Sequence, residues 1–279
     1  MTGALFVVAT PIGNLADISG RALEVLRSVS FIVCEDTRHS RLLLARYGIS
    51  KETVSLPAFA ERKRSAGILD RVSAGEDCAL ITDAGSPGIS DPGQALVSGA
   101  VERGIRVSPI PGPSAALAAL TVSGLPSSRF HFLGFLPRKS ADRAKLLAEV
   151  EPLRATLVMF ESPHRLADSL KGLDAALGQR QACVARELTK VHEEIARGTL
   201  AELATRYEGK EVLGEIAIVV EGRPEASRWS ESEVRSAIAE RIGRGESLKE
   251  LSRDLAASSG WAAQALYRLA LSLRSPQKL

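Results

Sequence analysis

The segment 79–93 constrains the fold more than any other part of the chain. Residues 78–82 form an apolar run with the length of a buried strand. The next eleven residues hold three Gly, two Pro and two Asp, so a strand cannot continue through them. In open α/β sheets, ligands bind just beyond the carboxyl ends of strands. The sequence therefore predicts a strand in an α/β sheet that ends in a ligand-binding loop.

Three more apolar runs near the start of the chain end in comparable loops. The runs are residues 5–9, 31–34 and 107–110, and the loops after them are 10–14, 35–39 and 111–114. Helical patterns separate the runs, and this alternation indicates a largely parallel sheet covered by helices on both faces. Each loop alone could only turn the chain or cap a helix, for example through Asn14 or Ser114. Because parallel strands end at one edge of a sheet, the loops together predict a pocket.

Composition argues against several classes of protein. The chain is 45% hydrophobic and 25% charged, as in ordinary soluble proteins, and its net charge of +3 predicts no general attraction to nucleic acid. Three widely spaced cysteines indicate reduced thiols in a cytosolic protein rather than zinc ligands. No apolar run approaches the roughly 20 residues of a membrane helix, and no basic leader precedes the first run. We expect a soluble, cytoplasmic protein that is not attached to a membrane.

We predict three parts along the chain. Residues 1–117 form an amino-terminal α/β domain, and residues 118–223 form a second α/β domain with strands near 130–135, 156–160, 182–185 and 215–220. From residue 224 the composition becomes polar and then helical, which predicts a small helical extension over 224–279.

Charged residues follow three of the predicted strands. The segments are 35–39, 160–165 and 185–190, and each combines acidic, basic and hydroxyl side chains. Helix caps and solvated ion pairs are one explanation for each segment. For residues 35–39 we favour a role in holding or activating a substrate, because packing rarely requires five polar groups at a strand end.

Other motifs limit the chemistry. The chain has no Gly-x-Gly-x-x-Gly, no phosphate-binding Walker lysine and no Gly-x-Ser-x-Gly, and its four histidines lack metal-ligand spacing. We therefore expect no dinucleotide, no triphosphate and no metal. Basic clusters at 62–64 and 138–145 are typical of solvated helix faces, or of phosphate contacts if they lie near the pocket. An aromatic content of 4% indicates no base-stacking platform.

Seven strings resemble, in order, those of the ribosomal RNA methyltransferases of the tetrapyrrole methylase superfamily. They are residues 10–15, 35–39, 83–87, 111–114, 134–137, 161–165 and 185–190. The resemblance covers essentially the whole chain, and several of the strings are absent from corrin-modifying members. The chain departs from close members at 56–61, where they tend to have histidines, at Ser114, where many have cysteine, and at Ala263 and Gln264.

The resemblance implies two α/β domains of the tetrapyrrole methylase type, with S-adenosylmethionine (SAM) in the cleft between them and a homodimeric assembly. It implies methylation of the ribose 2′-hydroxyl of a cytidine in 16S rRNA, and so the small ribosomal subunit as partner. It also implies a set of residues at the cofactor. These are Ile12, Gly13, Asp83, Gly85, Ser86, Pro87, Ile89, Ser114, Ala115, Glu161 and Gly198.

The charged strand ends supply the candidates for chemistry on the methyl acceptor. A 2′-hydroxyl is a weak acid, so a base or a cation near the oxygen should accelerate transfer. For proton removal we single out Glu35, Asp36, His39 and Glu187, and for substrate orientation Arg38, Arg186 and Lys190. Methylation of a tetrapyrrole or of a protein side chain, and a non-catalytic role in RNA binding or ribosome assembly, are the alternatives.

Overall fold

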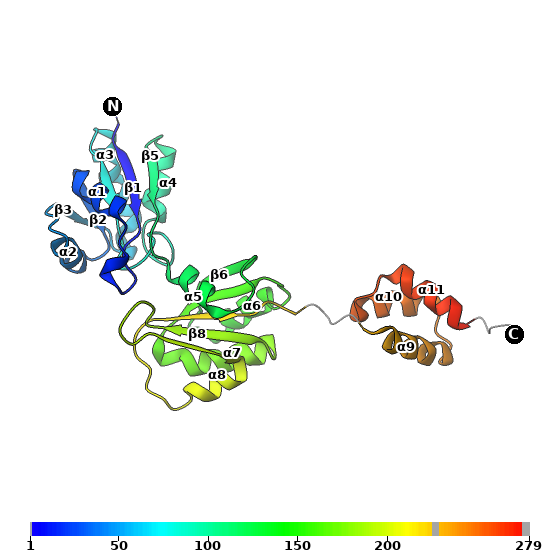
Figure 1. Cartoon of the computed structure of the whole chain (residues 1–279). Helices are drawn as coiled ribbons and strands as arrows, with labels where there is room; N and C mark the ends of the chain where they lie inside the picture. Colours follow the sequence, from blue (N-terminus) through cyan, green and yellow to red (C-terminus); the bar gives the residue numbers. More distant parts are fainter. Residues whose placement is uncertain (1, 225–228, 275–279) are drawn as a thin grey trace. The chain divides into compact units, whose positions relative to one another are not determined.

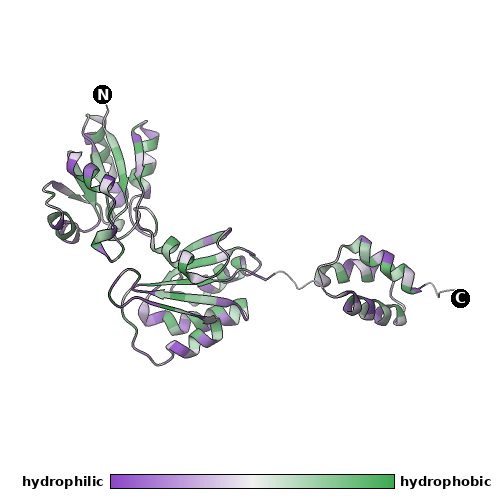
Figure 2. Cartoon of the chain, in the orientation of Figure 1, coloured by the Kyte–Doolittle hydropathy of each residue, from purple (hydrophilic) through white to green (hydrophobic). Residues whose placement is uncertain are grey.

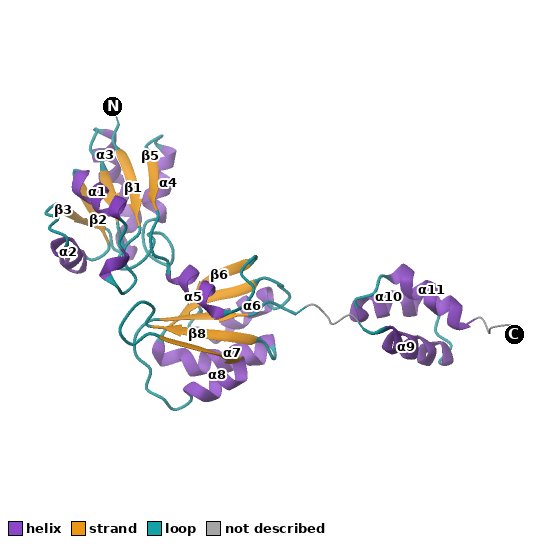
Figure 3. Ribbon diagram, viewed as in Figure 1, coloured by secondary structure: helices purple, strands orange, loops and turns teal. Residues whose placement is uncertain are grey.

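The structure of the chain is a computed structural model that describes residues 2–224 and 229–274. The chain divides into two compact units, Met1–Gly222 and Arg223–Leu279. Two five-stranded sheets make up the first unit, and the second unit is helical (Figures 1 and 3). The predicted boundary between residues 117 and 118 falls inside helix α5 (Ala115–Ser123) and stays a prediction.

The first sheet is parallel throughout, as the sequence predicted. Its order is β3 (Glu52–Ser55), β2 (Phe31–Cys34), β4 (Cys78–Leu80), β1 (Ala4–Val8) and β5 (Arg106–Ile110). Edge strand β3 was not predicted, because it is half-exposed and lacks an apolar run. All five strands end at the same edge of the sheet.

Helices cover both faces of this sheet. Helices α1 (Gly20–Ser28) and α2 (Thr37–Arg46) pack on one face, and α3 (Glu61–Ser73) and α4 (Gln94–Glu102) pack on the other. Figure 2 shows hydrophobic residues concentrated in the strands. The two cores hold the strand edge rigidly in place, so the loops that leave it have fixed starting points.

The second sheet is mixed rather than parallel. Its order is β6 (Phe130–Phe135), β7 (Thr156–Glu161), β10 (Ile216–Val220), β8 (Gln181–Arg186) and β9 (Glu194–Thr199). Only β6 and β7 pair in parallel, and β10 is antiparallel to both of its neighbours. The first residue of β10 therefore lies opposite the last residues of β7 and β8, so the chain before β10 reaches the same sheet edge.

The second sheet is also covered on both faces. Helices α6 (Ser140–Val150), α7 (Leu166–Leu177) and α8 (Leu200–Tyr207) pack on one face. Helix α5 follows β5 of the first sheet and packs on the other face, together with Ile12. Helix α5 is apolar around most of its circumference, buries Ala116, Ala119 and Leu120 against this face, and connects the two sheets.

The second unit is a small helical bundle. Helices α9 (Glu231–Gly243), α10 (Leu248–Ser259) and α11 (Ala263–Arg274) share an apolar core, and the indole of Trp261 donates to the carbonyl of Trp229 over 2.7 Å. Within the described residues, no helix has the length and apolarity to span a membrane.

Candidate functional site

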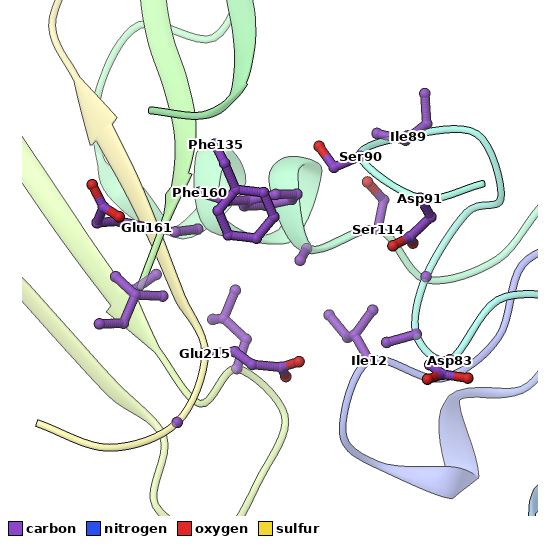
Figure 4. Close-up of a pocket in the computed structure, with 18 of the residues that line it drawn as sticks. Ile12, Asp83, Ile89, Ser90, Asp91, Ser114, Phe135, Phe160, Glu161 and Glu215 are labelled. Atoms are coloured by element: carbon purple, nitrogen blue, oxygen red, sulfur yellow. The ribbon is translucent and has the colours of Figure 1, made fainter. Parts of the chain in front are cut away.

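A pocket of about 420 Å³ lies within the first unit, at the loops that follow the parallel strands (Figure 4). Its first side comes from the loops after β1, β2, β4 and β5, and its second side comes from the facing edge of the second sheet. The lining residues are Ile12, Glu35, 83–86, 89–91, Ser114, Ala115, Phe135, 160–163, Ala185, Leu188 and 214–217. The volume is within the range of small-molecule sites, about 300–1,000 Å³.

Two of the pocket loops are joined by backbone hydrogen bonds. Thr10 and Gly85 exchange N–H···O bonds of 2.9 and 3.1 Å, and the Thr10 hydroxyl donates to the carbonyl of Thr82 over 3.0 Å. Gly85 has a φ of +76°, a conformation that glycine adopts without strain. The loops after β1 and β4 therefore form one surface of the pocket.

Carboxylates gather on the first side of the pocket. The pKa of Asp91 is raised to about 6, mainly by burial and further by the charges of Asp83 and Glu215. A hydrogen bond from Thr82 partly offsets this increase. Burial also raises the pKa of Glu35, and the charges of Asp91 and Asp83 contribute. The Oδ1 atom of Asp83 is buried without a hydrogen-bond partner among the described residues. Such a site favours a ligand that brings positive charge or hydrogen-bond donors.

The second side of the pocket has an apolar, aromatic part. The rings of Phe135 and Phe160 lie 5.6 Å apart between centroids, and those of Phe132 and Phe160 lie 5.1 Å apart. Phe135 lines the pocket and is 58% exposed, so its ring is accessible from the pocket (Figure 4). Planar apolar groups pack well on such rings.

Glu161 is a buried carboxylate at the end of β7, and its partners are all local. It accepts hydrogen bonds from the backbone of Ser162 at 2.7 Å and from the hydroxyl of Ser169, and Arg165 lies 3.4 Å away. Arg165 in turn donates to the carbonyls of Leu136 and Pro137. Glu161 therefore fixes the loops after β6 and β7 to each other at the pocket edge.

The loop after β8 contacts the loop after β1 at very short range. A Cβ atom added to Gly13 would lie 2.5 Å from the side chain of Lys190 and 2.9 Å from the carbonyl of Leu188. Lys190 pairs with the carboxylates of Glu187 at 2.7 Å and of Glu215 at 2.9 Å. Only glycine allows this approach, so Gly13 determines how closely the two sides of the pocket meet.

Glu187 is occupied by structural contacts. It has a φ of +51°, and its carboxylate accepts from Lys190 and from the backbone of Glu215 at 3.0 Å. The hydrogen bond from Lys190 lowers the pKa of Glu187 below its usual value, despite partial burial. A Cβ atom at Gly214 would overlap this carboxylate at 2.3 Å. Glu187 thus supports the 214–215 turn and does not itself line the pocket.

Most of the predicted cofactor residues are brought together. The lining residues among them are Ile12, Asp83, Gly85, Ser86, Ile89, Ser114, Ala115 and Glu161. Gly13 and Pro87 lie beside lining residues without lining the pocket. Gly198 is elsewhere, because it pairs with Ala182 near the far end of β8 and packs against Glu202 at the start of α8.

Of the predicted catalytic residues, only Glu35 lines the pocket. Asp36 caps α2 through the backbone of Arg38 at 2.8 Å and pairs with its guanidinium, which holds the pKa of Asp36 at about 2. Arg38 and His39 are exposed on α2. Arg186 pairs with Glu194 at 3.0 Å. Helix capping and ion pairing thus account for the contacts of most of these side chains.

Gly214 and Glu215 are lining residues that the sequence did not indicate. They precede a strand, whereas the sequence signals for the pocket lie in loops that follow strands. The antiparallel direction of β10 brings them to the pocket. Asp91 and Phe135 lie within strings that the sequence singled out, but neither was assigned a role.

Comparison with known proteins agrees with this architecture. The family model of the tetrapyrrole (corrin/porphyrin) methylases matches residues 4–204. The chain is 46% identical over 273 residues to the ribosomal RNA small subunit methyltransferase I of Mesorhizobium japonicum, which covers 97% of this chain and 92% of the relative. It is 41% identical over 276 residues to the protein of that name from Synechocystis sp., and this alignment covers 98% of this chain and 99% of the relative.

Solved structures support the same fold. A diphthine synthase superposes with a TM-score of 0.59 at 17% identity, covering 78% of this chain and 90% of that one. A uroporphyrin III C-methyltransferase from Thermus thermophilus superposes with a TM-score of 0.56 at 18% identity, covering 78% of this chain and 97% of that one. Because the family model matches most of the chain and these relatives align over nearly all of it, the chain belongs to the tetrapyrrole methylase family, in the branch of the ribosomal RNA small subunit methyltransferases I.

Proposed function

We propose that this protein is a SAM-dependent methyltransferase that methylates the ribose 2′-hydroxyl of a cytidine in 16S rRNA. The pocket at the strand ends is the observation on which the proposal rests, together with the names of relatives that align over nearly the whole chain. SAM supplies an electrophilic methyl group on a cationic sulfur. The family resemblance supports a homodimer in the cytoplasm, with the small ribosomal subunit as partner.

The pocket residues fit this cofactor. Asp83 has a buried oxygen without a hydrogen-bond partner among the described residues, and Asp91 lies on the same loop, so both suit the hydroxyl and cationic groups of SAM. The rings of Phe135 and Phe160 suit its planar adenine. Metal ligands are not gathered here, since the described residues contain no group of three or more such side chains.

We propose that Glu35 accepts the proton of the 2′-hydroxyl. Of the four residues singled out for proton removal it alone lines the pocket, and it follows β2 directly on the first side. Burial raises its pKa, so its carboxylate is a stronger base than an exposed glutamate. Asp36, His39 and Glu187 are then positioning or surface groups, because none of them lines the pocket. Arg38 is 88% exposed on its side chain and free to meet RNA phosphates beyond its bond to Asp36.

The test has two stages. Titration calorimetry with SAM should give saturable binding, and a purely RNA-binding or assembly factor should give none. Radiolabelled SAM is then incubated with small ribosomal subunits, and the label is mapped by its protection of one linkage from alkaline cleavage, since a 2′-O-methyl group blocks that cleavage. Label on protein, on a porphyrin or on a base would contradict the proposal.

The role of Glu35 has a separate test. We expect Glu35→Gln to reduce single-turnover methyl transfer by about 10²–10⁴-fold, the usual contribution of a general base, while SAM binding stays within threefold. Glu24→Gln is the matched control, because it makes the same change at an exposed glutamate on α1 outside the pocket. Equal rates for the native protein and Glu35→Gln would exclude this base.

A further inference from the structure

An exposed aromatic residue lies in the connection between β3 and α3, and no packing contact of the described core accounts for it. Phe59 lies in the short 3₁₀ helix η2 (Ala58–Ala60) and is 92% exposed. Leu56 before it and Ile68 on α3 are buried in the core of the first sheet, whereas Phe59 belongs to none of the hydrophobic clusters. Single exposed apolar residues are common, so exposure alone indicates little.

The chain on both sides of Phe59 is bonded to segments next to the pocket, by backbone at Leu56 and by the side chain at Glu61. On one side, the N–H of Leu56 donates to the carbonyl of Cys34 over 2.7 Å, directly before Glu35. On the other side, the Glu61 carboxylate accepts from the backbone of Gly93 at 2.9 Å and of Ala95 at 2.7 Å, just after Asp91. Two residues span at most about 7 Å, so Phe59 lies close to this second anchor. The segment therefore holds an exposed ring between an anchor at the end of β2 and an anchor on the loop after β4, both on the first side of the pocket.

Three basic side chains follow Phe59 within the next five residues. Arg62, Lys63 and Arg64 are exposed in the first turn of α3. Cations there are unfavourable for the helix, because the amino end of a helix is electropositive. Within the described part of the chain, neither Arg62 nor Lys63 has an ion pair, whereas Arg71 of the same helix pairs with two glutamates. Their placement therefore does not stabilise the helix.

We propose that Phe59, Arg62 and Lys63 form a binding surface for single-stranded RNA, with a base stacked on Phe59 and phosphates at the two cations. Stacking of bases on aromatic rings beside basic side chains is the usual way in which proteins bind unpaired RNA. The proposal deepens the proposed function, because the surface would hold nucleotides next to the one whose ribose enters the pocket. Cations beside an exposed ring complement the phosphates and bases of RNA, so RNA rather than a second copy of this chain is the occupant that we propose.

The test compares Phe59→Ala with Phe59→Trp and Phe59→Leu in methyl transfer to small ribosomal subunits. We expect Phe59→Ala to raise KM by about fivefold or more, with kcat within twofold, since each stacked base contributes enough for at least that factor. Phe59→Trp should restore KM, and Phe59→Leu should not, because only an aromatic ring stacks. Val101→Ala on α4 is the control, since Val101 is 64% exposed on another helix.

The charged part is tested by salt dependence. The double variant Arg62→Gln with Lys63→Gln should lower the slope of log affinity against log salt by about 1.4 for a single-stranded RNA fragment, about 0.7 for each phosphate contact. Unchanged KM in Phe59→Ala, or equal rescue by leucine, would overturn the proposal. So would dissociation of a dimer by Phe59→Ala in sedimentation, which would assign the surface to a second copy. SAM binding and methyl transfer by the native protein report on the proposed function separately.

Discussion

Asp91 lets the electrostatics of the pocket be tested without any ligand. Its pKa is raised from 3.8 to about 6, first by burial and then by the charges of Asp83 and Glu215. The folded state therefore binds this proton more tightly than the unfolded state. The resulting stabilisation is complete below about pH 4 and is lost as the pH rises through about 6. Asp91→Asn cannot ionise and should not show this loss.

The size of the effect follows from the rise in the pKa of Asp91. That rise is equivalent to a loss of about 3 kcal/mol of unfolding free energy above pH 7, and the partial exposure of Asp91 reduces the expected loss to about 1–3 kcal/mol. We expect Asp91→Asn to be more stable than the native protein by that amount at pH 8, and nearly equal to it at pH 4. For a unit of this size, each kcal/mol raises Tm by about 2–4 °C.

The assay is thermal unfolding followed by far-UV circular dichroism between pH 4 and pH 8. Tryptophan fluorescence is unsuitable, because both tryptophans, Trp229 and Trp261, lie in the second unit. Glu24→Gln is the control, since Glu24 is exposed on α1. If Asp91→Asn is no more stable at pH 8, or if its advantage is the same at both pH values, then burial and the neighbouring charges do not raise the pKa of Asp91 as described.

Two further predictions concern the framework of the pocket. Glu161→Ala leaves Arg165 and Ser169 without their buried partner, and should lower the free energy of unfolding by about 3–5 kcal/mol in chemical denaturation. Glu149→Ala, at an exposed position, is its control. A loss below about 1 kcal/mol would show that the network is dispensable. Gly13→Ala forces the loops after β1 and β8 apart, because the added methyl would overlap Leu188 and Lys190. SAM binding by calorimetry should weaken tenfold or more in Gly13→Ala, whereas Gly20→Ala, where the added methyl has open space, should bind normally. Equal SAM affinity in the two glycine variants would contradict the role given to Gly13.

The sequence by itself determined four strands of the first sheet and one side of the pocket. Strands β1, β2, β4 and β5 are apolar runs that stop at Gly, Pro or charged residues, and such signals are local. Once those strands are parallel, their ends must meet at one edge. The loop 83–91 is therefore a pocket surface in the structure, as its composition predicted.

Only the tertiary structure decided which side chains are available for chemistry. Glu35 lines the pocket, whereas Glu187 and Lys190 pair with each other, although all of them follow apolar strands in the sequence. The difference depends on partners distant in the chain, such as Glu215, which no local pattern reveals. Strand direction was equally hidden from local sequence patterns. Antiparallel β10 brings Gly214 and Glu215 to a sheet edge where only the ends of strands were expected. Pairing partners and strand direction are set by long-range packing, so these features could not be predicted from local sequence.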